Sequence, residues 1–119
     1  MAVVVLDAGH GGSDLGATYQ GRQEKDDTLA LTLAVGRLLA EDPDIDVVYT
    51  RETDVYDTPL VKARKANAAN ADYFVSIHRN STPVPSTYSG VETLVYSKGT
   101  LAETLARNIA SALSAIGFA

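Results

Sequence analysis

An α/β fold, with a mainly parallel sheet flanked by helices, is the architecture that the sequence pattern indicates. Short apolar runs alternate with longer segments of helical periodicity, as in sheets whose parallel strands are joined by helices. The first run, residues 3–7, is apolar up to its last residue, which is typical of a strand covered on both faces. The 119 residues suit one domain, and we find no internal repeat or low-complexity stretch.

The first half of the chain predicts strand, helix and strand. The strand at 3–7 ends in a glycine-rich loop, and a helix follows over about 25–40. The apolar stripe of this helix is Leu31, Val35 and Leu38, with Glu24 on the same face just before its start. Pro43, between two aspartates, breaks the chain, and a second strand is predicted over 45–50.

The second half predicts helix, strand, strand and helix. Thr58 and Pro59 mark a helix start, because Pro is tolerated in the first turn. The residues at helical spacing that follow are Leu60, Ala63, Arg64, Asn67 and Ala71. Strands are predicted over 73–78 and 90–96. The last helix is expected to bury Leu101, Leu105, Ile109, Leu113 and Ile116, and to end at Gly117.

Composition excludes several classes of function. Ten Lys and Arg against fifteen Asp and Glu give a net charge of −5, and no basic patch is present, so we expect no nucleic-acid partner. The chain has no Cys, so a metal would be held by His and carboxylates. No apolar run approaches the roughly 20 residues of a membrane span, and no signal peptide precedes the first strand.

Both histidines fall at predicted strand ends, which points to a metal site. His10 follows the first strand and His78 closes the third, and the carboxyl ends of parallel strands meet at one edge. Glu24, before the first helix, faces the same crevice. Two imidazoles and a carboxylate suit Zn²⁺ with an open position for water. The alternatives are hydrogen-bonded surface histidines and a glutamate that interacts with the helix dipole.

Two other functions fit the glycine-rich loop less well. A dinucleotide fingerprint would need a third glycine where Asp14 stands, and that carboxylate would repel a pyrophosphate. A serine hydrolase would need a G-x-S-x-G elbow, and Ser13 has no evident base.

The motifs together resemble the zinc-dependent N-acetylmuramoyl-L-alanine amidases of the type 3 class. The matching segments run in order along the chain: 5–12 (VLDAGHGG), Asp14, 16–17, Glu24, 50–51 (TR), Leu60, Arg64, 66–67, 71–72, 76–80 (SIHRN) and 90–93 (GVET). The resemblance implies that His10, Glu24 and His78 bind Zn²⁺. It also implies that the protein hydrolyses the amide between N-acetylmuramic acid and L-alanine of peptidoglycan, outside the cell or in the cell wall.

Other motif residues are assigned supporting roles. Asp7 is expected either to orient a metal ligand or to cap a turn, and Arg51 and Arg64 to pair with acidic groups or line the sheet edge. Gly11 and Gly12 are expected to let the backbone approach the metal or the substrate.

Two residues beside His78 are candidates for binding substrate. Arg79 stands where the family pattern has a small residue, and is expected to bind a substrate carboxylate or to reach solvent. Asn80 is expected to shape the loop that follows, and is the second candidate.

The resemblance also implies that the family domain continues past this sequence. Residues 1–119 correspond to its N-terminal majority, truncated before the last strands, and the general acid/base glutamate is expected beyond Ala119. Glu92 superficially resembles that glutamate, but the order of elements places it on an earlier strand. The alternative function is a relative that binds zinc and peptidoglycan without cleaving them. The uncovered sheet edge is expected to favour association.

Overall fold

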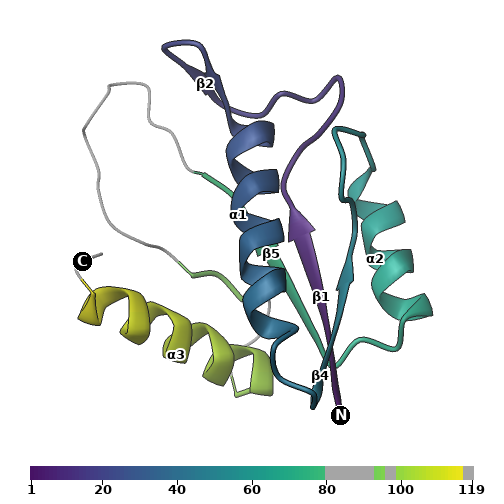
Figure 1. Ribbon diagram of the computed structural model, residues 1–119, viewed down its shortest axis with the longest axis vertical. Helices are drawn as coiled ribbons and strands as arrows, with labels where there is room; N and C mark the ends of the chain where they lie inside the picture. Colours follow the sequence, from purple (N-terminus) through teal and green to yellow (C-terminus); the bar gives the residue numbers. More distant parts are fainter. Residues whose placement is uncertain (80–92, 96–98, 117–119) are drawn as a thin grey trace. The chain divides into compact units, whose positions relative to one another are not determined.

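The computed structural model describes residues 1–79, 93–95 and 99–116, which fall into two units, Met1–Asn80 and Ser81–Ala119. The first unit contains a three-stranded parallel sheet in the order β4-β1-β5 (Figure 1). The strands are β1 (Ala2–Ala8), β4 (Ile45–Tyr49) and β5 (Tyr73–Ile77). The predicted α/β class and its first three strands are confirmed, and β1 is the central strand because it pairs with both neighbours.

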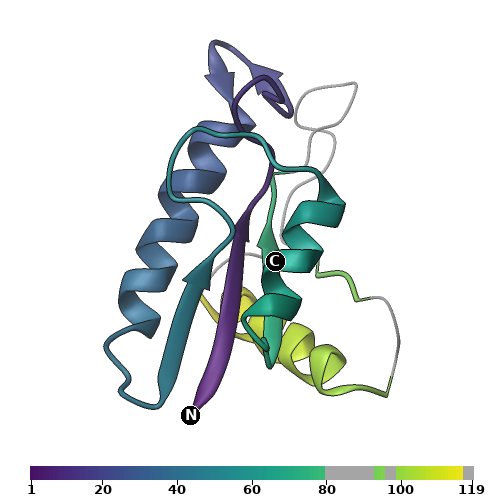
Figure 2. The same cartoon turned by 90° about the vertical axis from the view of Figure 1, so that its right-hand side faces the viewer.

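Two helices cover the two faces of this sheet. Helix α1 (Glu24–Leu39) connects β1 to β4, and α2 (Pro59–Ala68) connects β4 to β5. The two connections cross the sheet in opposite directions, so right-handed crossovers place the helices on opposite faces, as Figures 1 and 2 show. A short hairpin that the sequence analysis missed, β2 (Thr18–Tyr19) with β3 (Arg22–Gln23), precedes α1.

The face of α1 that packs on the sheet is not the one predicted. Leu31 and Leu38 are 54% and 67% exposed, whereas Thr28, Thr32 and Gly36 are buried. The Tyr49 side chain of β4 packs directly against Gly36 and leaves no room for a larger residue, because a Cβ on Gly36 would lie 1.9 Å from the Tyr49 hydroxyl. The large side chain comes from the strand, so the helix contributes small residues at this contact.

Helix α2 begins as predicted, with the Thr58 hydroxyl accepting a hydrogen bond from the Val61 N–H at 3.3 Å. The face of α2 that is buried also differs from the one predicted from the spacing of its apolar residues. Ala66 is buried and Lys62 is directed into the sheet, while Leu60 and Arg64 are exposed.

The second unit contains α3 (Leu101–Ala115), capped by the Thr100 hydroxyl, which accepts from the Glu103 N–H at 3.2 Å. Leu105, Ile109 and Leu113 of its predicted stripe are half-buried, and Leu101 and Ile116 are exposed. The strand predicted over 90–96 is wrong for 93–95, which are not in a strand, and its other residues lie outside the described ranges. None of the helices described is long and apolar enough to cross a membrane.

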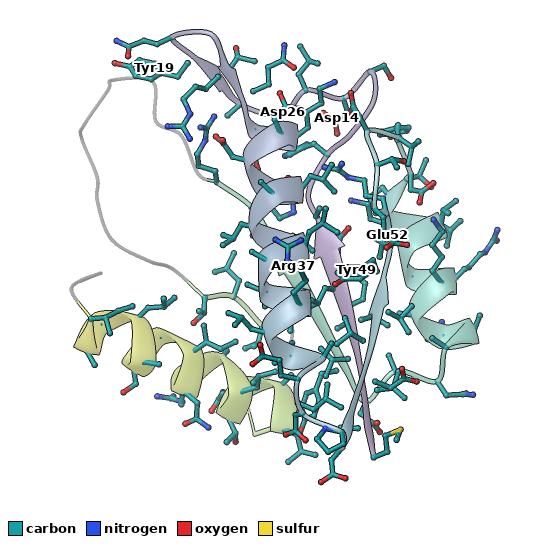
Figure 3. All side chains as sticks on the ribbon, viewed as in Figure 1. Asp14, Tyr19, Asp26, Arg37, Tyr49 and Glu52 are labelled. Carbon is teal, nitrogen blue, oxygen red and sulfur yellow. The ribbon has the colours of Figure 1, made fainter. Side chains whose placement is uncertain are left out.

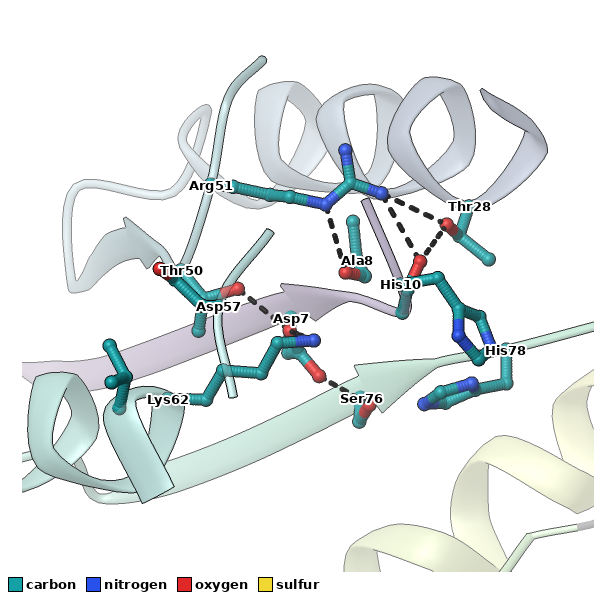
Figure 4. A network of polar contacts seen from close by, with 12 residues as sticks. Asp7, Ala8, His10, Thr28, Thr50, Arg51, Asp57, Lys62, Ser76 and His78 are labelled. Atoms are coloured by element: carbon teal, nitrogen blue, oxygen red, sulfur yellow. Dashed lines mark hydrogen bonds and ion pairs between the residues drawn. The ribbon is translucent and has the colours of Figure 1, made fainter. Parts of the chain in front are cut away.

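A buried carboxylate, Asp7, links the strands of the sheet to α2 (Figure 4). Its Oδ1 accepts from the Thr50 hydroxyl at 2.7 Å and pairs with Lys62 Nζ at 2.9 Å, and its Oδ2 accepts from the Ser76 hydroxyl at 2.6 Å. Burial raises the pKa of Asp7, but these donors outweigh it and hold the pKa below its ordinary value. Asp7 therefore neither orients a histidine nor caps a turn.

Thr28 and Thr32 lie one turn apart on the buried face of α1 and should respond oppositely to the same change. The Thr28 hydroxyl donates to the Gly9 carbonyl at 2.7 Å, whereas Thr32 Oγ1 has no hydrogen-bond partner within the described part of the chain. We expect Thr32→Val to raise the free energy of unfolding by about 1 kcal/mol and Thr28→Val to lower it by about 1–3 kcal/mol. Urea denaturation measures both, and equal effects would contradict this account.

Replacing Asp7 should destabilise the fold in a pH-dependent way. Because its folded pKa lies below the ordinary 3.8, ionised Asp7 stabilises the fold above that pH, and the contribution disappears as the pH falls through the folded pKa. At pH 7, Asp7→Asn should cost about 3 kcal/mol, since it leaves Lys62 buried and unpaired. The deficit should shrink below pH 3.8 in urea titrations. Asp46→Asn, on the exposed side of β4, is the control and should change little.

Candidate metal centre

Glu24, the first residue of α1, is the centre of the cluster at the carboxyl edge of the sheet. Its side chain is 4% exposed. Oε1 accepts from the Ala17 N–H at 3.0 Å, and Oε2 accepts from the Arg79 N–H, also at 3.0 Å. Burial raises the pKa of Glu24, but these backbone donors and the nearby imidazoles together lower it by more. Its pKa therefore lies below the ordinary value. Glu24 is thus an ionised, firmly held acceptor.

Both histidines point a ring nitrogen at the same oxygen of Glu24. Oε2 lies 3.1 Å from His10 Nε2 and 3.2 Å from His78 Nδ1, and the two rings stand perpendicular with centroids 5.0 Å apart. His10 leaves β1 with a left-handed φ of 66°, and His78 directly follows β5. The structure therefore brings together the three residues that the sequence analysis named.

The geometry of this cluster fits a zinc ion. One nitrogen or oxygen atom from each residue lies within 4.8 Å of the others. In a tetrahedral site with bonds of 2.0–2.1 Å, neighbouring ligand atoms are about 3.3 Å apart, close to the two separations from Glu24. His78 is 47% exposed, so the cluster is open to solvent on one side.

Asp14 orients His10, a role that the sequence analysis did not assign. Its Oδ2 lies 2.9 Å from His10 Nδ1, and this hydrogen bond lowers the pKa of Asp14. A proton held on Nδ1 would leave the Nε2 lone pair available to bind a metal ion, as in many metal-bound histidines. The four-residue spacing within a glycine-rich loop was the available signal.

The glycines of this loop serve packing contacts other than the predicted one. A Cβ on Gly11 would lie 2.0 Å from the Val55 carbonyl oxygen, so Gly11 and Gly12 approach the 51–56 loop rather than the metal cluster. Gly9 and Gly16 are the glycines at the cluster, because a Cβ on Gly9 would lie 2.5 Å from the His78 ring and a Cβ on Gly16 would lie 2.5 Å from His10. Gly16 also has a left-handed φ of 68°.

Arg51 holds the end of β1 against the start of α1. Its guanidinium donates to the carbonyls of Ala8 at 3.2 Å, Gly9 at 3.1 Å, Lys25 at 3.0 Å and Thr53 at 2.9 Å. Figure 4 shows the bond to Ala8. Arg51 is only 4% exposed and bonds carbonyl oxygens instead of the acidic groups predicted. The exposed Arg64 takes no part in this end of the sheet.

A second clamp joins the His10 loop to the 51–56 loop. Lys25 Nζ donates to the Gly12 carbonyl at 3.0 Å and pairs with Asp54 Oδ2 at 2.7 Å. Asp54 Oδ1 accepts from the Gly12 N–H at 2.7 Å. The hydrogen bond from Lys25 lowers the pKa of Asp54, so the clamp persists at neutral pH.

The two residues predicted to bind substrate have different outcomes. Arg79 lies beside the cluster, and its guanidinium pairs with Asp27 of α1 and donates to the Ala17 carbonyl at 3.3 Å. Asn80 lies outside the described residues, as does Glu92.

Asp14→Asn should weaken zinc binding by about ten- to hundredfold, because an amide holds the His10 tautomer less firmly than a carboxylate. Competition with a chromophoric chelator measures the affinity. Asp26→Asn is the matched control: Asp26 is exposed in the first turn of α1, near the same end of the molecule (Figure 3), and its loss should leave affinity unchanged. Equal affinities for parent and Asp14→Asn would remove Asp14 from the site.

Comparison with known proteins identifies relatives with the same fold. The chain is 48% identical over 81 residues to the endolysin of Bacillus phage SPP1, covering 68% of this chain and 30% of the relative. It is 40% identical over 82 residues to the sporulation-specific N-acetylmuramoyl-L-alanine amidase of Bacillus subtilis, covering 68% and 32%. The chain thus matches about a third of the length of these relatives.

Solved structures agree with these matches. The amidase AmiC2 of Nostoc punctiforme superposes with a TM-score of 0.81 at 34% identity, covering 89% of this chain and 57% of that one. The catalytic domain of CwlV from Bacillus (Paenibacillus) polymyxa gives 0.72 at 39% identity, covering 76% and 51%. The family model described as N-acetylmuramoyl-L-alanine amidase matches residues 4–117. A match over nearly the whole chain, on a sheet of the same fold, shows that the protein belongs to the N-acetylmuramoyl-L-alanine amidase family.

Proposed function

We propose that the protein is a zinc-dependent hydrolase that cleaves the amide between N-acetylmuramic acid and L-alanine of peptidoglycan. The observation that carries this proposal is the convergence of His10 Nε2 and His78 Nδ1 on one oxygen of Glu24, at 3.1 and 3.2 Å. Family membership supports the substrate class, and two imidazoles with one carboxylate support zinc as the metal.

The residues of the cluster divide the work of holding the metal. His10 through Nε2, His78 through Nδ1 and Glu24 through Oε2 would bind Zn²⁺. A bound zinc supplies a polarised carbonyl and a water whose pKa is about 7. With zinc on Nε2, Asp14 would hold the proton of His10 on Nδ1. The Ala17 and Arg79 N–H groups keep Glu24 ionised and aimed at the histidines.

Hydrolysis also needs a group that moves a proton from the attacking water to the leaving amine. The glutamate that the resemblance assigns to this role is expected beyond Ala119 and stays a prediction. The same holds for action in the cell wall or outside the cell, and for association through the sheet edge.

The test measures zinc and cleavage separately on the 119-residue chain. Zinc content is determined first, and purified peptidoglycan is then incubated with and without chelator while newly exposed alanine amino groups are counted. Because the proton-transferring glutamate is expected beyond Ala119, we expect this chain to release alanine amino groups slowly, about 10²–10⁴-fold below a domain that contains that glutamate. This slow release should be sensitive to the chelator. The variants His10→Ala and His78→Ala should each lose both the tightly bound zinc and the release of alanine amino groups, because two remaining ligands do not hold the ion firmly.

Each outcome has a distinct meaning. Equal zinc content in the parent and both variants would overturn the ligand assignment. Bound zinc with no release would mean that the metal site is built and that proton transfer depends on the glutamate expected beyond Ala119. Release that stays absent when that segment is supplied would favour the alternative function, a relative that binds zinc and peptidoglycan without cleaving them. Circular dichroism of the variants controls for unfolding.

A further inference from the structure

Two arginines from separate elements converge on one carboxylate next to the metal cluster. Arg79, which follows β5, pairs through Nη1 with Asp27 Oδ2, and Arg22 of β3 pairs through Nη2 with Asp27 Oδ1 at 2.9 Å. Arg79 is 33% exposed and Arg22 is 69% exposed. The guanidinium pair, defined as Arg22 and Arg79, therefore remains accessible from solvent although Asp27 bridges it.

Arg79 is connected directly to the cluster. Its backbone N–H donates to Glu24 Oε2 at 3.0 Å, the oxygen that both histidines face. Its Nη2 donates to the carbonyl of Ala17, and the Ala17 N–H donates to the other oxygen of Glu24. Arg79 thus contacts Glu24 directly through its backbone and indirectly, by way of Ala17, through its guanidinium.

The pair carries a surplus positive charge. Two guanidinium groups face one carboxylate, and the hydrogen bond from Arg22 lowers the pKa of Asp27, so Asp27 offsets one of the two charges at neutral pH. A planar guanidinium fork matches the geometry of a carboxylate and binds it better than it binds a neutral group.

We propose that Arg79, assisted by Arg22, binds a carboxylate on the peptide side of the scissile amide and thereby selects peptides that are free acids. This inference rests on the proposed function for the position of the scissile bond. The sugar side of that bond offers neutral hydroxyl and acetamido groups, whereas the peptide beyond L-alanine carries carboxylates. Charge complementarity therefore places the peptide, and not the glycan, against the guanidinium pair.

Binding of the released peptide tests this without requiring cleavage. Zinc-loaded protein is titrated calorimetrically with a peptide beginning with L-alanine, whose second residue carries either a free carboxylate or a carboxamide. The parent should bind the free acid roughly tenfold more tightly, as one charge-assisted hydrogen bond allows. Arg79→Gln should abolish that preference and leave the affinity for the carboxamide peptide unchanged.

Two further variants sharpen the result. Arg37→Gln removes the same charge from an exposed site on α1, about 15 Å along the helix from Asp27, and should keep the preference. Arg79→Lys keeps the charge without the fork and should retain part of it. Zinc content is compared in every variant, so that a disturbed Glu24 is recognised.

Three outcomes would overturn the proposal: the parent binds both peptides equally, the parent binds neither, or Arg79→Gln weakens both peptides by the same factor. The last outcome would mean that Arg79 has a structural role only, joining the end of β5 to α1 through Asp27. Failure of the proposed function would give a different result. In that case the protein would not cleave peptidoglycan but would still prefer the free-acid peptide, and the carboxylate site would remain supported.

Discussion

The buried guanidinium of Arg51 is the contact on which the functional end of the molecule depends. Where β1 ends, the carbonyls of Ala8 and Gly9 leave the sheet ladder, and buried carbonyls need donors. Arg51 supplies those donors and also bonds the Lys25 carbonyl in the first turn of α1. A single side chain therefore ties the end of the strand to the first turn of the helix, close to His10 and Glu24.

Glu24 shows how a buried charge is retained at such a site. Desolvation opposes its ionised form, and two backbone N–H groups from different loops offset that cost. Because the donors are main-chain groups, they remain whichever side chains stand at positions 17 and 79. The side chain at 79 is thus free to vary without loss of this hydrogen bond, and here it brings a guanidinium beside the cluster.

Much of the architecture and the cluster was predictable from local pattern. The strands at 3–7, 45–50 and 73–78 and the two helices between them appear within a few residues of their predicted bounds. His10 and His78 were identifiable because each lies within two residues of the end of a strand, and parallel strands end at one edge. Glu24 needed only its place at the start of α1. These predictions depend on residues close together in the chain.

The sequence by itself determined the order of elements and the edge at which the histidines meet, since periodicity and strand direction are local properties. Only the tertiary structure decided which face of α1 is buried, because Tyr49 and the Gly9 carbonyl, both distant in sequence, require Gly36 and Thr28 opposite them. The tertiary structure likewise brought Arg51 to the Ala8 carbonyl, 43 residues away in the chain, and Asp7 to Lys62, 55 residues away. Apolar spacing cannot reveal such contacts, since a buried polar group is stable only with a partner that the fold supplies.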